Sequence, residues 1–141
     1  MGFSISAAAA IIGVSVLMIL EISLGTLMPV YMDIQKSYDD MRDRAVEELL
    51  TSITITYTNT TVNASGYDLN VTLENSGSTT VDTQYLDVLI NGVSVPFSCD
   101  SSYIYPENNA SIQVYGVSGS GENKVKIITE NGISCYDSYM V

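Results

Sequence analysis

The sequence predicts an α+β protein, in which a long N-terminal hydrophobic transmembrane helix precedes an antiparallel immunoglobulin-like β-sandwich. Two observations support this fold class. The first twenty residues carry no charge, and after Leu50 apolar side chains alternate with polar ones in about seven short segments. The chain accordingly divides into a transmembrane helix (1–30), an amphipathic helical stalk (31–50) and an extracytoplasmic β-sandwich domain (51–141). An up-and-down barrel is the alternative architecture for the last segment.

The apolar N-terminal segment lacks the features of a cleaved signal peptide. Such a peptide combines a basic start, a short apolar core and a small-residue cleavage site. Here no basic side chain precedes the apolar run, and the first one is Lys36. A helix of about 20 residues crosses a ~30 Å hydrocarbon core, and apolar residues resume after Glu21 as ISLGTLMPVYM. We therefore predict an uncleaved membrane anchor.

Glu21 and Pro29 interrupt this anchor. Glu21 either marks the membrane interface, where its carboxylate reaches water, or pairs with an amine of another subunit in a helical bundle. Pro29 either kinks the helix or ends the anchor and starts the next segment. Both alternatives stay open for each residue.

The stalk that follows has helical periodicity. Its apolar positions recur every three or four residues: Tyr31, Ile34, Tyr38, Met41, Ala45 and Leu49. Acidic and basic side chains fill the other faces, as expected for an amphipathic helix. The apolar stripe could pack on the following domain, on a second copy as a short coiled coil, or in a filament core.

The remaining chain is predicted to form strands near residues 51–58, 67–75, 85–90, 93–97, 110–117, 125–129 and 133–141. In the first of these, alternation places Ile53, Ile55 and Tyr57 on one buried face. In the fifth, Tyr115 is expected to point inward beside Val114. The dipeptides Asn91-Gly92 and Asn131-Gly132 are turn signals, and the first is a strong two-residue hairpin signal.

Acidic residues dominate the predicted β-domain. Residues 51–141 contain nine acids and only two bases, Lys124 and Lys126. Nucleic-acid binding needs a basic surface that displaces counterions, so no nucleic-acid partner is expected. The composition suits a soluble surface in salty water or facing cations.

Cys99 and Cys135 are the two cysteines of the chain. A bond between them would stabilise the fold by roughly 3–4 kcal/mol on the chain-entropy model. We predict this disulfide, in an oxidising space, with two unpaired core thiols as the alternative. Zinc binding is not expected, because the chain has no His and two thiolates alone do not complete a structural site.

Four Asn-x-Ser/Thr sequons provide candidate glycosylation sites: Asn59, Asn63, Asn70 and Asn109. The first two are expected to share an inter-strand loop, and Asn70 is expected to face solvent. The sequons, the cysteines and the sandwich all favour a domain outside the cytoplasm. The three basic residues that follow the anchor point the other way under the positive-inside rule, but acids adjoin them.

No catalytic constellation is present, so no enzymatic activity, cofactor or metal is expected. The chain has no His for acid–base work. The stretch GVSGSG at residues 116–121 has the composition of a flexible linker and lacks the Lys of a phosphate-binding loop. Acid pairs such as Asp82 with Asp87, or Asp100 with Glu107, are expected to be solvated.

The start MGFSISAAAAIIG, the stretch GTLMPVY and the charged run KSYDDMRDRA before a small β-domain carry a family resemblance. In this arrangement the chain resembles the F-type (FlaF/ArlF-like) accessory proteins of the archaeal flagellum, or archaellum. These belong to the wider archaellin and archaeal type IV pilin superfamily. True archaellins and pilins carry a short basic leader ahead of the apolar helix. This sequence starts at MGFS, so the leader is expected to be absent or already removed.

The resemblance implies a protein in the cell membrane, with a single pass and an immunoglobulin-like domain in the space under the surface layer. There it would bind surface-layer protein and archaellum components and steady the rotating filament, often as a homodimer. A filament subunit with the same helix in the filament core is the alternative. A third hypothesis is a membrane-tethered module for a small ligand or sugar, whose sign would be an aromatic patch near Tyr103 and Tyr105.

Overall fold

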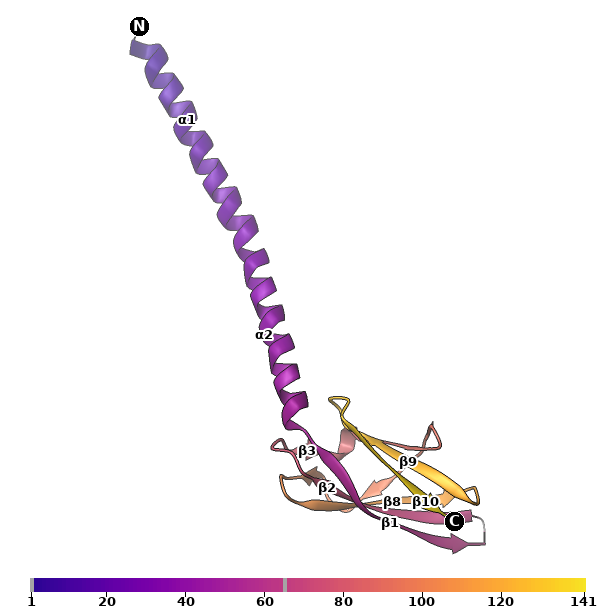
Figure 1. The fold of residues 1–141 in the computed structure, drawn as a ribbon. Helices are drawn as coiled ribbons and strands as arrows, with labels where there is room; N and C mark the ends of the chain where they lie inside the picture. The colour runs from indigo at the N-terminus through magenta and orange to yellow at the C-terminus, as the bar shows by residue number, and fades with distance from the viewer. Residues whose placement is uncertain (1, 65) are drawn as a thin grey trace. The chain divides into compact units, whose positions relative to one another are not determined.

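The computed structural model describes residues 2–64 and 66–141. Its contacts divide the chain into two compact units, Met1–Asp43 and Arg44–Val141. The first unit is helical, and the second holds the last turns of the helix together with the β-strands (Figure 1). The last turns of the predicted stalk therefore belong to the compact unit that contains the strands.

The N-terminal helix is interrupted once, by a short π-helical segment. Helix α1 spans Gly2–Ile22, the π-helix η1 spans Ser23–Leu27, and α2 spans Met28–Leu50. At 1.5 Å per residue, α1 is roughly 32 Å long, which is enough for a hydrocarbon core of about 30 Å. The continuous helix Ser4–Leu50 contains an 18-residue window with a mean hydropathy of 2.3, which is long and apolar enough to cross a membrane.

Pro29 explains where the π-helix lies. A proline inside a helix has no N–H to donate, and its ring collides with the carbonyl four residues earlier, here that of Gly25. Gly25 lies inside the π-helix Ser23–Leu27, where the wider turn changes the hydrogen-bonding pattern directly before the proline. Pro29 therefore neither ends the helix nor starts a new segment, and it is accommodated by a local widening.

Two four-stranded antiparallel sheets make up the β-domain (Figure 1). The first sheet has the order β1-β2-β8-β6, the second has the order β10-β9-β4-β5, and β3 pairs with β7 apart from both. The strands are β1 Ile53–Asn63, β2 Gly66–Asn75, β3 Val81–Asp82, β4 Asp87–Ile90, β5 Val93–Ser94, β6 Ser98–Cys99, β7 Tyr103–Ile104, β8 Asn109–Val117, β9 Glu122–Ile128 and β10 Ser134–Met140. A 3-10 turn, η2, spans Thr83–Tyr85. Separate sheets confirm the predicted sandwich over the barrel.

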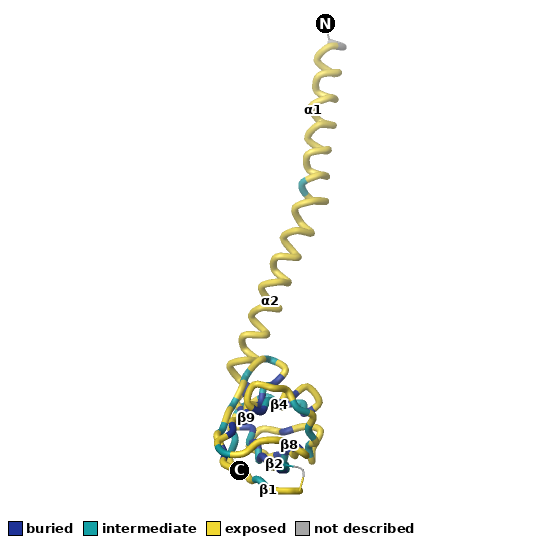
Figure 2. The backbone as a smooth tube through the Cα atoms, turned by 90° about the vertical axis from the view of Figure 1, so that its right-hand side faces the viewer, coloured by how far each residue is buried: buried dark blue, intermediate teal, exposed yellow. Residues whose placement is uncertain are grey.

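The core lies between the two sheets and is built by alternation. On β2, Tyr67, Leu69, Val71 and Leu73 are at most 1% exposed, as predicted. Strands β8, β9 and β4 add a second set: Ala110, Ile112, Val114, Val125, Ile127, Val88 and Ile90. Figure 2 shows these buried positions inside the β-domain, with exposed positions along the helix. Each large apolar side chain buried this way contributes about 1.5–3 kcal/mol.

The predicted turns form as expected. Asn91 and Gly92 both have positive φ, 50° and 85°, between the antiparallel strands β4 and β5. This is the backbone conformation that a two-residue hairpin of matching twist requires, and Asn and Gly tolerate it best. Gly132, with φ of 84°, lies in the five-residue loop 129–133 that joins β9 to β10.

Two tyrosines predicted to be buried are exposed. Tyr57 is 63% exposed because the pairing of β1 with β2 shifts between Ile55 and Tyr57, and such a bulge moves the following side chains to the other face. Tyr115 is 64% exposed, since Val114 beside it takes the inward position and neighbouring strand residues point to opposite faces. Both predictions were wrong for these local reasons.

Thr51 joins the end of α2 to the strands within the second unit. Its hydroxyl donates to the Glu47 carbonyl at 2.8 Å and lies 2.7 Å from the Thr79 hydroxyl, and it accepts a bond from Asn131 Nδ2 at 2.6 Å. Because the only hydroxyl proton of Thr51 goes to Glu47, Thr79 must be the donor in its pair. Thr51 is 6% exposed, so these bonds satisfy a polar group buried at the helix end.

Candidate functional site

The helical unit has an apolar and exposed surface. Along α1 the large apolar side chains are more than half exposed, among them Ile11, Leu17 and Ile19. A helix that is apolar all round is typical of a segment surrounded by lipid or by other helices. Glu21 lies one residue before the end of α1 and is exposed, so its carboxylate sits at the end of the span that α1 can form.

The stalk stripe remains uncovered at its C-terminal end. Leu49 is 84% exposed although it lies in the same compact unit as the β-domain. This position therefore does not pack on the sandwich, which was one of the three alternatives. Tyr38 and Met41, earlier in the stripe, are 71% and 68% exposed.

The two cysteines are free thiols in the structure and lie on different sheets. Cys99 is on β6 at one edge of the first sheet, and Cys135 is on β10 at one edge of the second. Strand β10 adjoins β1, at the opposite edge of the first sheet from β6, where Thr58 Oγ1 donates to Asp137 Oδ2 at 2.8 Å. The structure thus has the two unpaired thiols that the sequence left as the alternative, and the predicted disulfide is not formed in it.

Burial makes the thiol of Cys135 a weak acid. Desolvation raises the pKa of Cys135 from 9.0 to about 11, against the smaller opposite effect of backbone hydrogen bonds. The sulfur therefore stays protonated at neutral pH and is a poor nucleophile. This environment is typical of a structural cysteine, and both cysteines pack against the edge of the core.

The four sequon asparagines are all exposed, and all lie on the first sheet. Asn59 and Asn63 lie in β1 and not in a loop as expected, because the Thr-rich segment continues the strand to Asn63. Asn59 and Asn70 are direct cross-strand partners, and Asn70 in turn pairs with Gln113 of β8. The outer face of the first sheet therefore presents sequons side by side.

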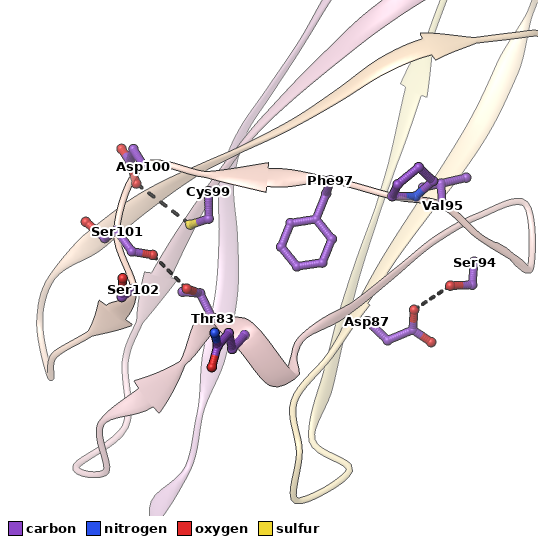
Figure 3. Close-up of a pocket in the computed structure, with 11 residues that line it drawn as sticks. Thr83, Asp87, Ser94, Val95, Phe97, Cys99, Asp100, Ser101 and Ser102 are labelled. Carbon is purple, nitrogen blue, oxygen red and sulfur yellow. Dashed lines mark hydrogen bonds between the residues drawn. The ribbon is translucent and has the colours of Figure 1, made fainter.

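An open pocket of about 660 Å³ lies beside β6 (Figure 3). The ring of Phe97 lies between Cys99 and the Asp87–Ser94 pair in that view, and Ser94 Oγ donates to Asp87 Oδ1 at 2.7 Å. On the other side, Asp100 Oδ1 accepts a bond from the Ser111 amide at 3.0 Å. The third hypothesis expected an aromatic patch at Tyr103 and Tyr105, but the ring that lines this pocket is Phe97.

The outer face of the second sheet holds a second hollow, of about 560 Å³. Its lining includes Leu89, Lys124, Lys126 and Tyr136, which lie on three adjacent strands. From the sequence, Lys124 and Lys126 stood out only as the two bases of residues 51–141. Their spacing of two within a predicted strand was nevertheless a signal, since residues i and i+2 share a face.

The two hollows can be described by the groups that line them. Within residues 2–64 and 66–141, no group of three or more His, Cys, Asp or Glu side chains is placed to hold a metal ion. The side chains that line the two hollows offer hydrogen bonds, charge and apolar contact. These are the means by which a protein surface recognises a partner.

Comparison with known proteins identifies a shared fold. No protein-family model and no curated protein matches the chain. Among solved structures, the chain is similar to a chain of the archaellum periplasmic stator protein complex FlaF and FlaG from Sulfolobus acidocaldarius. The match has a TM-score of 0.52 and 22% sequence identity, and it covers 64% of this chain and 90% of that chain. Its extent is close to that of the β-domain.

Proposed function

We propose that the chain is a non-enzymatic, membrane-anchored component of the archaeal motility machinery. The observation that carries the proposal is the likeness of its fold to a chain of an archaellum stator complex. This protein also has an apolar N-terminal helix that is long enough to cross a membrane. The sequence motifs at MGFSISAAAAIIG and KSYDDMRDRA support the same assignment independently of the fold. The anchor is α1, and the β-domain is the part that meets partners.

The finer proposal is that the β-domain binds surface-layer protein and so holds the rotating archaellum in the envelope, as a stator does. A sandwich whose surface has hollows lined by charged, polar and apolar side chains is suited to binding. Other archaellum components are the second class of partner, because the similar structure is a complex of two stator proteins. A homodimer would place two stalk stripes together.

For its topology, we propose a single pass with the β-domain outside the cytoplasm. Helix α1 is roughly long enough to span the hydrocarbon core, and Glu21 near its end would then reach the interface. The sequons on the first sheet are exposed, as glycosylation requires. They agree with a domain outside the cytoplasm, where N-glycosylated domains lie.

A filament subunit is the second candidate function, and one observation favours it. The apolar side chains of α1 are exposed on all sides, which is also what a helix needs in order to pack among copies of itself in a filament core. The destination of this helix, membrane or filament, separates the two functions.

Immunogold labelling of the β-domain on intact and on sheared cells separates them directly. Label confined to the envelope at the bases of filaments is the expected result and makes α1 a permanent anchor. Label that repeats along detached filaments would replace the stator proposal with the filament one. Label spread over the envelope without relation to filaments would contradict both.

A further inference from the structure

The two bases of the β-domain lie together on one outer face. Lys124 and Lys126 are two residues apart on β9, and both are exposed, while Val125 between them is fully buried. They are the only bases among residues 51–141, against nine acids. The positive charge of this domain is therefore concentrated at one place, on the second sheet.

Neither lysine is neutralised by another residue that the structure describes. No hydrogen bond or ion pair joins either ammonium group to another described residue, although Glu122 lies two positions before Lys124 on the same strand. Both ammonium groups therefore remain unpaired in a domain that contains nine acids. Their charge is available to a group outside the chain.

Apolar and aromatic groups flank the lysines in register. Tyr136 of β10 is opposite Lys126 on one side, and Leu89 of β4 is opposite it on the other. The Tyr136 side chain is 79% exposed, and together these residues border the hollow of about 560 Å³. We call Leu89, Lys124, Lys126 and Tyr136 the lysine face. It combines charge with aromatic and apolar contact area, as protein-binding surfaces do.

The sequons leave this face open. All four lie on strands of the first sheet, on β1, β2 and β8, and none lies on the second sheet. Glycans on the first sheet would cover the opposite side of the sandwich. A partner protein would therefore meet the second sheet without competing with them.

We infer that the lysine face docks a carboxylate-rich segment of a protein partner. The ammonium groups would each bind a carboxylate, and the Tyr136 hydroxyl could donate to a third, while Leu89 and the tyrosine ring cover apolar parts of the segment. An anionic membrane surface fits less well, because a broad negative surface would also face the nine acids of the domain, whereas a narrow segment can contact the lysines and avoid most of those acids.

This inference rests on the proposed function in one respect: it assigns the surface by which the β-domain holds its partner. The two can fail separately. Immunogold label can locate the protein at filament bases even if the lysine face binds nothing, and the lysine face can bind an acidic segment in a filament subunit.

The test uses the full chain in detergent micelles and a fluorescein-labelled peptide of alternating Glu and Gly as the probe. The variant K124Q/K126Q removes two positive charges from the lysine face. The matched control S98E/Q113E lowers the net charge by the same two units, at a cross-strand pair of exposed residues on the first sheet. Fluorescence anisotropy gives the affinity of each, and thermal unfolding checks that each variant is folded.

We expect the Glu peptide to bind and a Gln version of it to bind weakly. K124Q/K126Q should lose about tenfold in affinity, as expected for two surface charge pairs, and S98E/Q113E should change by less than about threefold. Equal losses in both variants would show that only net charge matters, and would overturn the inference. So would no binding of the peptide, unchanged binding by K124Q/K126Q, or tighter lysine-dependent binding to anionic vesicles than to the peptide.

Discussion

The hydroxyl groups of Tyr67 and Tyr139 lie 2.8 Å apart inside the β-domain, although the residues are 72 positions apart in the chain. Tyr67 comes from β2 of the first sheet and Tyr139 from β10 of the second, so the bond joins the two sheets. Their rings meet edge to face, with centroids 5.9 Å apart. Such a ring pair adds about 0.5–1.5 kcal/mol beyond the area that it buries.

Removing one of these two hydroxyls should lower the free energy of unfolding by more than half of what removing both would, because the remaining hydroxyl is left buried without a partner. In Tyr139→Phe the Tyr67 hydroxyl, on a side chain 0% exposed, loses its partner, and we expect a loss of about 1–3 kcal/mol in the free energy of unfolding. The double variant Y67F/Y139F should lose less than the sum of the single variants. Denaturant unfolding of all four proteins measures the coupling, and additive losses would contradict a shared hydrogen bond.

Alkaline pH should lower the stability of the β-domain against unfolding, and Tyr139 should be one cause. Burial, together with the hydrogen bond that Tyr139 shares with Tyr67, raises the pKa of Tyr139 well above its ordinary value of 10.0. The unfolded chain therefore loses this proton first, so the stability is complete below about pH 10 and falls as pH rises above it. Unfolding midpoints across this range should fall less steeply in Tyr139→Phe. The exposed Tyr57→Phe serves as control, and an equal slope in both variants would refute the assignment.

Thr51→Val should loosen the attachment of α2 to the strands. The change keeps the side-chain shape but removes the hydroxyl that bonds Glu47, Thr79 and Asn131, and leaves the Asn131 amide without this acceptor. We expect a loss of about 1–3 kcal/mol in unfolding free energy. Thr54→Val, at an exposed position with one long contact of 3.5 Å, should change it by less than about 0.5 kcal/mol. Equal effects would contradict the role of Thr51.

The cysteines should react with thiol reagents as two free groups of unequal reactivity. Without reductant, the denatured chain should release two thiols, and a count of zero would instead establish the disulfide. In the folded protein at pH 8, Cys135 should react more slowly than Cys99 because its pKa of about 11 leaves little thiolate. Variants C99S and C135S, labelled separately, assign each rate.

Glycan occupancy should be limited by the pairing of Asn59 with Asn70. Directly opposed strand residues have Cβ atoms about 4.5–5.5 Å apart, too close for two bulky glycans. Trypsin releases residues 45–124 as one peptide that carries all four sequons, since no base lies between Arg44 and Lys124. In protein from its natural cells, the mass of this peptide should show no more than three glycans. A fourth would contradict the predicted crowding.

The parts of the fold with strong alternation were predictable, and the parts set by long-range contacts were not. The buried face of β2 follows from Tyr67, Leu69, Val71 and Leu73, and the β4–β5 hairpin follows from Asn91-Gly92. The two-residue strands β3, β6 and β7 carry too few residues to show a period. They exist because partners far along the chain pair with them.

The interaction surfaces were less predictable than the core. The lysine face needs the order of β10, β9 and β4, which brings Tyr136 and Leu89 to either side of Lys126. A sequence shows the spacing of the lysines within one strand, but strand order is a tertiary property. The same limit explains why the sequence did not show that the two cysteines lie apart, because their separation depends on their positions at the edges of different sheets.

The π-helical turn at Ser23–Leu27 also has a mechanical consequence. An α-helix resists bending because each turn is tied to the next by regular hydrogen bonds, and that regularity is broken here directly before Pro29. A helix with one irregular turn bends most easily at that turn. A sideways pull on the β-domain would therefore bend the helix at this segment. If the protein is anchored as proposed, α1 could then keep its tilt in the bilayer while the β-domain moves.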